Sequence, residues 1–281
     1  MKATLQNIAL KNNLILNQVV PLSGGDINEV FLLKCDAGDF VIKQNDAHRF
    51  PKMFEAEAQG LALLRNSQSF KIPKVIAYGN EENTSYLLLE FISKGTPSSG
   101  FWKDFAQHLA KLHKTTTENF GLTHHNYIGS LSQINKTESF ASEFYINQRL
   151  EPQFKLASEK GFPFSSLDLF FKNISVEIPK EVPSLIHGDL WNGNYLVSEN
   201  NEPVLIDPAV AFAPREMDLA MMQLFGGFPQ EVYDTYHELF PLNHNWKNRI
   251  PIWQLYYLLV HLNLFGSGYL SQVTKIIKSF S

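Results

Sequence analysis

The chain has 281 residues, a formal net charge of −4, 44% hydrophobic residues and 19% charged residues. This composition supports a large hydrophobic core and excludes an intrinsically disordered chain. The net negative charge argues against a nucleic-acid partner, because proteins that bind nucleic acids usually have a positively charged binding surface. A single cysteine, Cys35, excludes an internal disulfide framework and favours a reducing, cytoplasmic location. No apolar run reaches the roughly 18 residues that predict a membrane span, so no membrane partner is expected.

Residues from about 19 to 91 have a strand-rich pattern. Strands at 30–34 and 40–43 are predicted to form a β-hairpin, because Gly38 lies in the short polar turn between them. Helical spacing of apolar residues follows at 51–67, and two more strands are predicted at 74–80 and 84–92. The predicted order β-β-α-β-β describes a small twisted sheet with one helix.

A Gly/Pro/Ser-rich segment at 93–100 predicts a link between two lobes, 1–92 and 93–281. Beyond the link the apolar spacing becomes helical, and strand-like patterns are expected only within 184–210. The predicted helices of this second lobe cover 101–116, 138–159, 165–172, 215–225, 229–239 and 248–265. The sequence therefore predicts an α+β protein with a sheet-rich first lobe and a mainly helical second lobe.

One stretch of the second lobe, SLIHGDLWNGNYLVSENNEPVLIDPAV at 184–210, combines acids and amides with apolar runs. The apolar runs at 185–186 and 204–206 are predicted to pair as a hairpin, with the polar residues 198–202 as its turn. In that hairpin Asp189, Asn194 and Asp207 gather at the end away from the turn. A turn that is simply rich in Asn and Asp is the alternative explanation.

These three polar residues have the spacing of a kinase catalytic loop followed by a metal-binding aspartate. Asn194 and Asp207 offer hard oxygen ligands that suit Mg²⁺, which also binds the phosphate oxygens of ATP. Asp189 is then free to accept the proton of a substrate hydroxyl. The stretch therefore predicts phosphoryl transfer.

Phosphoryl transfer of this kind also needs a lysine on the sheet and a glutamate on the next helix to orient it. Lys43 ends a predicted strand at the expected place. Of the two glutamates on the following helix, Glu57 shares a face with the apolar residues that pack toward the sheet, whereas Glu55 lies on a more solvated side. We therefore expect Lys43 and Glu57 to form the nucleotide-orienting pair.

Two further segments are candidates for nucleotide contacts. Gly24 and Gly25 precede a strand, where backbone N–H groups can approach phosphate oxygens closely, although an ordinary turn explains them as well. Glu90, Phe91 and Ile92 reach the lobe junction, where their backbone groups could contact an adenine edge. The second assignment depends only on position.

Two more residues are interpreted as structural support, and one histidine as part of the core. His187 is expected to hold the catalytic loop through side-chain hydrogen bonds. Asp218 lies in the first turn of a predicted helix, where the helix dipole favours a carboxylate, and it is expected to brace the same loop. His261 is interpreted as a core or groove histidine.

The segments HGDLWNGN, LIDPAV, REMDLAMMQLFGGF and WQLYYLLVHLNLFGSGY resemble the fructosamine kinase family, also called ketosamine 3-kinases. Further matching segments extend the resemblance from about residue 20 to 270. This family is a branch of the aminoglycoside-phosphotransferase-like kinases. The resemblance implies a bilobal protein-kinase-like fold and ATP- and Mg²⁺-dependent phosphorylation of the 3-hydroxyl of a ketosamine, which is a sugar attached to an amine by glycation.

The resemblance also implies roles for matching positions. These are Asp189 as base, Asn194 and Asp207 as Mg²⁺ ligands, Lys43 with Glu57 as the nucleotide-orienting pair, and Trp191 at the sugar. The family's phosphorylated product is unstable and releases the free amine, which implies a role in the repair of glycated proteins. The partner is then a small ketosamine or a glycated lysine of a protein.

Two other functions stay open. The first is a small-molecule kinase of the same fold that acts on an aminoglycoside or on choline. An aminoglycoside is a polycation, so an acid-lined cleft is expected for it. A choline site needs an aromatic cage, and Trp191, Trp253, Tyr256 and Tyr257 are candidates for one. The second is a pseudokinase without transfer activity, which the complete set of catalytic residues disfavours. The preferred sugar and the choice between monomer and homodimer are not determined by the sequence.

Overall fold

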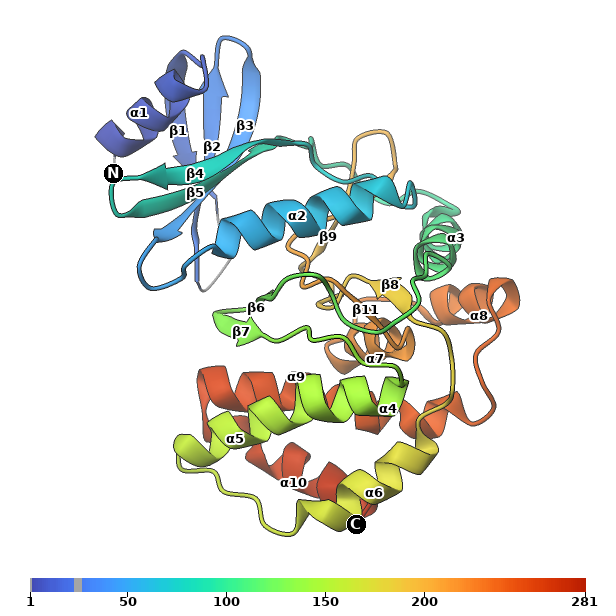
Figure 1. The fold of residues 1–281 in the computed structure, drawn as a ribbon. Helices are drawn as coiled ribbons and strands as arrows, with labels where there is room; N and C mark the ends of the chain where they lie inside the picture. Colours follow the sequence, from blue (N-terminus) through green and yellow to red (C-terminus); the bar gives the residue numbers. More distant parts are fainter. Residues whose placement is uncertain (1, 23–26) are drawn as a thin grey trace.

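The computed structural model describes residues 2–22 and 27–281. The two glycines predicted to approach phosphate, Gly24 and Gly25, lie outside the described residues. A five-stranded sheet and its helices form one lobe, and the remaining helices with three short strand pairs form the other (Figure 1). In the described part of the chain, no helix combines the length and the apolarity needed to cross a membrane.

The sheet of the first lobe is antiparallel and has the strand order β1-β2-β3-β5-β4. Its strands are β1 (Leu16–Pro21), β2 (Glu29–Cys35), β3 (Gly38–Asp46), β4 (Val75–Glu81) and β5 (Thr84–Glu90). The predicted hairpin is confirmed as β2–β3, and Gly38 closes its turn with a φ of 117°, which favours glycine. Helix α1 (Lys2–Lys11) and strand β1 were not predicted. Strand β1 lacks the alternation of buried and exposed residues that marks a strand in a sequence.

Helix α2 (Met53–Asn66) lies between the sheet and the second lobe (Figure 1). Its buried face, which includes Phe54, Leu61 and Leu64, belongs to the large apolar cluster that continues into the second lobe. A separate smaller cluster lies between α1 and the sheet. A Cβ added at Gly60 would lie 3.2 Å from Val210, so α2 packs closely against the segment that follows Asp207.

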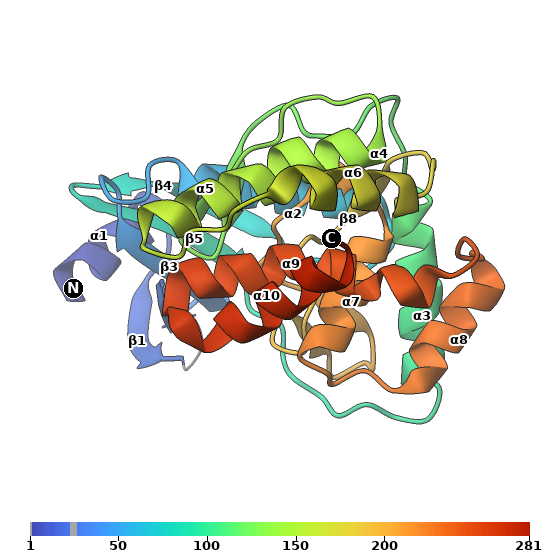
Figure 2. The same ribbon diagram turned by 90° about the horizontal axis from the view of Figure 1, so that it is seen from below.

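The predicted helices of the second lobe are confirmed, with shifted ends. They are α3 (Phe101–His113), α4 (Ala141–Glu143), the π-helical η1 (Phe144–Leu150), α5 (Glu151–Glu159), α6 (Leu167–Glu177), α7 (Glu216–Leu224), α8 (Gln230–Leu239) and α9 (Trp246–Phe265). The short η2 (Ser267–Tyr269) and α10 (Leu270–Ser279) follow and were not predicted. Figure 2 shows α9 flanked by α5 and α10. Together with α7, these two helices bury most of the length of α9.

The strand pairs of the second lobe correct two expectations. Strands β6 (Asn126–Ile128) and β7 (Leu131–Gln133) lie outside 184–210, the only stretch expected to contain strands. Strand β8 (Ser184–Ile186) pairs with β11 (Ala211–Ala213), and β9 (Tyr195–Val197) pairs with β10 (Pro203–Leu205). The expected pairing of 185–186 with 204–206 is therefore wrong, although 198–202 is the turn between β9 and β10 as predicted.

Both strand pairs bring the same two loops together. The loop at 187–194 follows β8, and the loop at 206–210 joins β10 to β11. The backbone N–H of Ala209 donates to the carbonyl of His187 at 2.9 Å. Gly188, with a φ of 83°, allows this approach, because a Cβ there would lie 2.1 Å from the Ala209 carbonyl oxygen. The polar residues of both loops thus face one site.

Candidate active site

Lys43 is held between two carboxylates. From the buried centre of β3 its Nζ donates to Glu57 Oε1 of α2 at 2.6 Å and to Asp207 Oδ1 at 2.5 Å. Burial opposes the charge of Lys43, but the carboxylates of Asp207 and Glu57 raise its pKa, so the ammonium stays protonated. The predicted pairing of Lys43 with Glu57 is present.

Asp207 has an unusual backbone conformation. Its φ of 55° lies in the left-handed region, and the following Pro208 further restricts its backbone. Its side chain is 42% exposed, although one of its oxygens binds Lys43. Strained residues of this kind persist where the surrounding structure holds them, commonly at functional sites. The strain here presents a carboxylate to open space.

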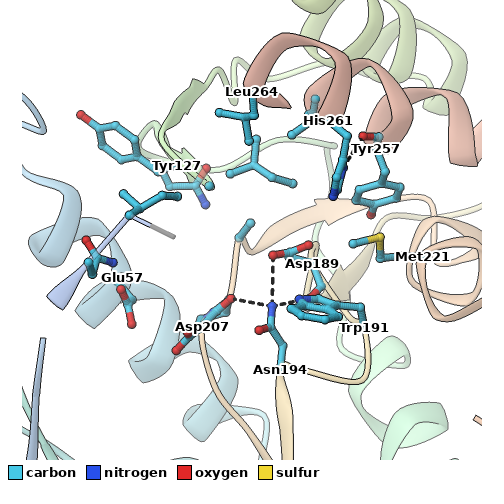
Figure 3. Close-up of a pocket in the computed structure, with 18 of the residues that line it drawn as sticks. Glu57, Tyr127, Asp189, Trp191, Asn194, Asp207, Met221, Tyr257, His261 and Leu264 are labelled. Carbon is cyan, nitrogen blue, oxygen red and sulfur yellow. Dashed lines mark hydrogen bonds between the residues drawn. The ribbon is translucent and has the colours of Figure 1, made fainter. Parts of the chain in front are cut away.

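Asn194 holds Asp189 in place. Its Nδ2 donates to the backbone oxygen of Asp189 at 2.8 Å and to Asp189 Oδ2 at 3.0 Å (Figure 3). In the described part of the chain, no hydrogen bond uses Asn194 Oδ1, so that oxygen remains available to a cation. Burial raises the pKa of Asp189 to about 7, with smaller contributions from the charges of Asp207 and Asp218 and an opposing one from the Asn194 hydrogen bond. Asp189 can therefore exchange a proton near neutral pH.

A buried network supports the loop that carries Asp189. Asp218 at the start of α7 accepts the backbone N–H groups of His187 and Gly188, each at 2.8 Å. The same carboxylate lies 3.2 Å from Nε2 of His113, a residue of α3. Sequence reasoning missed His113, because nothing in its local pattern distinguishes it from a core residue.

His187 ties the catalytic loop to the segment before Asp207. Its Nε2 donates to the Ile206 carbonyl at 2.9 Å, and its Nδ1 accepts the backbone N–H of Asp189 at 3.3 Å. Burial lowers the pKa of His187, which keeps the ring neutral and lets it donate and accept at once. The side chain thus has the geometry of a support for both loops.

These groups face a cavity of about 500 Å³ between the lobes. Lys43, Glu57, Asp189 and Asp207 line one end of it. The other end has an apolar wall, formed mainly by α9 together with η2 and the residue that follows α7: Phe225, Val260, His261, Leu264, Phe265 and Tyr269. Figure 3 shows the side chains of α9 facing the acids across the open space.

Trp191 lies at the boundary between the two ends. Its indole is 38% exposed and meets Phe225 edge to face, with 6.3 Å between the ring centroids. A Cβ added at Gly193 would lie 2.4 Å from the indole, so the ring covers the bare backbone of that glycine. A half-exposed tryptophan in this position offers a flat surface to a ligand.

Two sets of predicted residues lie elsewhere. Glu90, Phe91 and Ile92 are not among the residues that line this cavity, and the carboxylate of Glu90 accepts the backbone N–H of Lys74. The four aromatic residues considered for a choline cage do not gather around this cavity. Of these four, Trp191 and Tyr257 line the cavity, whereas Trp253 and Tyr256 do not. The polar atoms of Trp253 and Tyr256 are bound to Glu216 and Gln133 in the interior.

A comparison with known families identifies the chain. The sequence model of the family described as fructosamine kinase matches residues 2–281. The chain belongs to the fructosamine kinase family. A protein of Enterococcus faecium named "Probable ketoamine kinase" is 41% identical over 269 residues, which cover 94% of this chain and 95% of that protein. The chloroplastic protein-ribulosamine 3-kinase of Arabidopsis thaliana is 35% identical, with 94% of this chain and 83% of that protein covered.

Solved structures agree with this family membership. A crystal structure assigned as a fructosamine-3-kinase of Haemophilus somnus has a TM-score of 0.90 at 28% identity, covering 100% of this chain and 97% of that chain. An aminoglycoside phosphotransferase has a TM-score of 0.62 at 15% identity, with both chains covered completely, which shows the fold alone. The predicted α+β, bilobal, protein-kinase-like fold is confirmed.

Proposed function

We propose that this member of the fructosamine kinase family phosphorylates the 3-hydroxyl of a ketosamine with ATP. The observation that carries the proposal is the position of Asp189. This carboxyl group, whose pKa is raised to about 7, lines the same cavity as the Lys43–Glu57 pair and Asp207. A general base, a nucleotide-orienting lysine and a metal-binding carboxylate in one cavity are what phosphoryl transfer to an alcohol requires.

In the proposed reaction Asp189 accepts the proton of the 3-hydroxyl. The hydroxyl oxygen forms a bond to the γ-phosphorus of ATP, while the bond to the β–γ bridging oxygen breaks and ADP leaves. Lys43, held by Glu57, would contact the α- and β-phosphates. Residues 1–92 then form the nucleotide-binding lobe, and residues 93–281 form the catalytic and substrate-binding lobe.

The donor set near Asp207 fits Mg²⁺. Asn194 Oδ1 and the carboxylate of Asp207 are the two protein oxygens that could bind the ion. The described ranges contain no cluster of three or more His, Cys, Asp or Glu residues of the kind that binds a metal without help from a substrate. Mg²⁺ is commonly held by one or two protein oxygens together with substrate phosphates and water. When bound, the ion would neutralise charge that develops on the phosphate oxygens.

The apolar end of the cavity supports a ketosamine over an aminoglycoside. Beyond the catalytic acids, the described lining residues carry no Asp or Glu that could pair with a polycation. Burial lowers the pKa of His261 on this wall, which favours a neutral ring. A sugar at the acids with its amine substituent along the wall satisfies both ends, and the substituent can be free or part of a protein lysine.

The proposed role is the repair of glycated amines, since the 3-phosphate of a ketosamine is unstable and releases the free amine. The single cysteine supports a reducing, cytoplasmic setting for this activity.

A coupled ATP-consumption assay across four acceptors tests the proposal. We expect turnover with fructosyl-lysine or ribulosyl-lysine and none with an aminoglycoside or choline. Turnover of either of the last two alone would contradict the ketosamine assignment. ATP binding without transfer to any acceptor would show instead that the protein is a pseudokinase.

A further inference from the structure

Two adjacent tyrosines of α9 have opposite hydrogen-bonding states. Tyr256 and Tyr257 are 1% and 0% exposed, respectively. Tyr256 Oη donates to Gln133 Oε1 at 2.7 Å. Tyr257 Oη is buried as well, but it has no hydrogen-bond partner in the described part of the chain. The two side chains therefore match in burial and differ in the satisfaction of one atom.

The unpaired hydroxyl of Tyr257 is an exception that packing does not explain. Native proteins provide a partner for nearly every buried polar atom, because an unpaired one destabilises the fold. A phenylalanine would fill the same space without this cost. Burial raises the pKa of Tyr257 well above its usual value, so the group keeps its proton and can donate it in a hydrogen bond.

The position of Tyr257 shows where a partner can come from. Three other buried side-chain atoms in the described ranges also lack a partner, on Gln44, His124 and Asn263, but none of those residues lines the cavity. Tyr257 does line it, and Figure 3 shows its ring beside Met221, on the side of the site that also holds Asp189 and Trp191. The residue that carries the unpaired donor thus lines the substrate space.

We propose that Tyr257 Oη donates a hydrogen bond to a sugar oxygen of the ketosamine and so holds the sugar against Asp189. This inference rests on the proposed function. A ketose carries several hydroxyl groups, and a site built to bond one of them discriminates strongly against a substrate that lacks it. The role is one of substrate recognition, because Asp189 already supplies the base.

The substitution Tyr257→Phe removes only this oxygen. We expect kcat/KM for fructosyl-lysine or ribulosyl-lysine to fall by about ten- to hundredfold, which corresponds to one lost hydrogen bond to substrate. The affinity for ATP in the absence of ketosamine should not change, since the nucleotide contacts proposed above lie on other residues. The thermal unfolding midpoint should stay the same or rise, because the variant removes an unpaired buried group.

Tyr256→Phe is the matched control. It removes a hydroxyl from a neighbouring tyrosine that is equally buried, but there it leaves Gln133 Oε1 without its partner. We expect this variant to have a lower unfolding midpoint than the wild type. The crossed result, in which one variant loses substrate recognition and the other loses stability, would distinguish recognition from packing.

Deoxy analogues of the ketosamine identify the oxygen involved. An analogue that lacks the bonded hydroxyl should be a poorer substrate than its parent for the wild type, yet nearly equal to its parent for Tyr257→Phe. If Tyr257→Phe has wild-type kcat/KM for the ketosamine, or unfolds at a lower temperature as Tyr256→Phe does, the inference is wrong while the proposed function stands. Absence of turnover by the wild type with every ketosamine would overturn both.

Discussion

The two ends of the cavity obtain their properties in opposite ways. At the charged end each group is held by defined partners. Two carboxylates bind Lys43, and Asn194 binds Asp189. Asp218 holds the loop that carries Asp189. At the apolar end, Phe225 and Phe265 are left 38% and 54% exposed. Charged groups must be held in place before the substrate arrives if they are to stabilise a transition state. Exposed aromatic surface, in contrast, stabilises a complex only when a ligand covers it. The comparison separates chemistry from substrate recognition.

The largest effect is expected from Asp189→Asn at the charged end. This variant should lower kcat by about three orders of magnitude, because an amide cannot accept the hydroxyl proton. ATP affinity, measured by calorimetry, should be nearly unchanged. Asp104→Asn, which changes a half-exposed carboxylate of α3, is the control and should behave as the wild type. Wild-type turnover by Asp189→Asn would exclude this residue as the base.

Asp207→Ala should have the next largest effect, and it acts on binding. We expect the affinity for Mg-ATP to fall by about a hundredfold, because the proposed ion loses a carboxylate ligand. ATP without Mg²⁺ should bind the variant at least as well as the wild type, since a negative charge near the phosphates is removed. Titration calorimetry with and without Mg²⁺ measures both values. Equal loss under the two conditions would argue against a metal role for Asp207.

A pH profile of the wild type sharpens the assignment of the charged end. The pKa of Asp189 is raised to about 7, so the carboxyl is mostly protonated below that pH and cannot act as a base. We expect kcat/KM to rise by up to about tenfold per pH unit below the midpoint and to level off above it. A profile that is flat between about pH 5.5 and 8.5 would contradict this.

The smallest effect is expected at the apolar end, from Phe265→Ala. The test compares kcat/KM for two ketosamines, one formed from hexylamine and one from methylamine. Loss of the Phe265 ring should lower the hexylamine-to-methylamine ratio by about three- to tenfold, because the longer substituent loses apolar contact. Phe140→Ala is a matched control, since Phe140 is also 54% exposed but does not line the cavity. An equal ratio in both variants would show that the wall does not bind the amine substituent.

Much of the fold and of the site follows from short stretches of sequence. The β2–β3 hairpin, α2 and the helices of the second lobe were predicted, because alternating or helical apolar spacing is a local property of the chain. The choice of Glu57 over Glu55 followed from the same spacing, and the pair with Lys43 is formed at 2.6 Å. The candidate base and metal ligands were likewise identified by their spacing within residues 184–210.

Tertiary structure alone decided the features that join distant segments. The pairing of β8 with β11 instead of β10, and the contact of His113 with Asp218, depend on which buried surfaces meet, and residues far apart in the chain determine that. The same holds for the tyrosines of α9: both are apolar-face residues in the sequence, but Gln133 reaches only Tyr256. Local spacing determined which residues could act, and long-range packing determined which hydroxyl was left for a substrate.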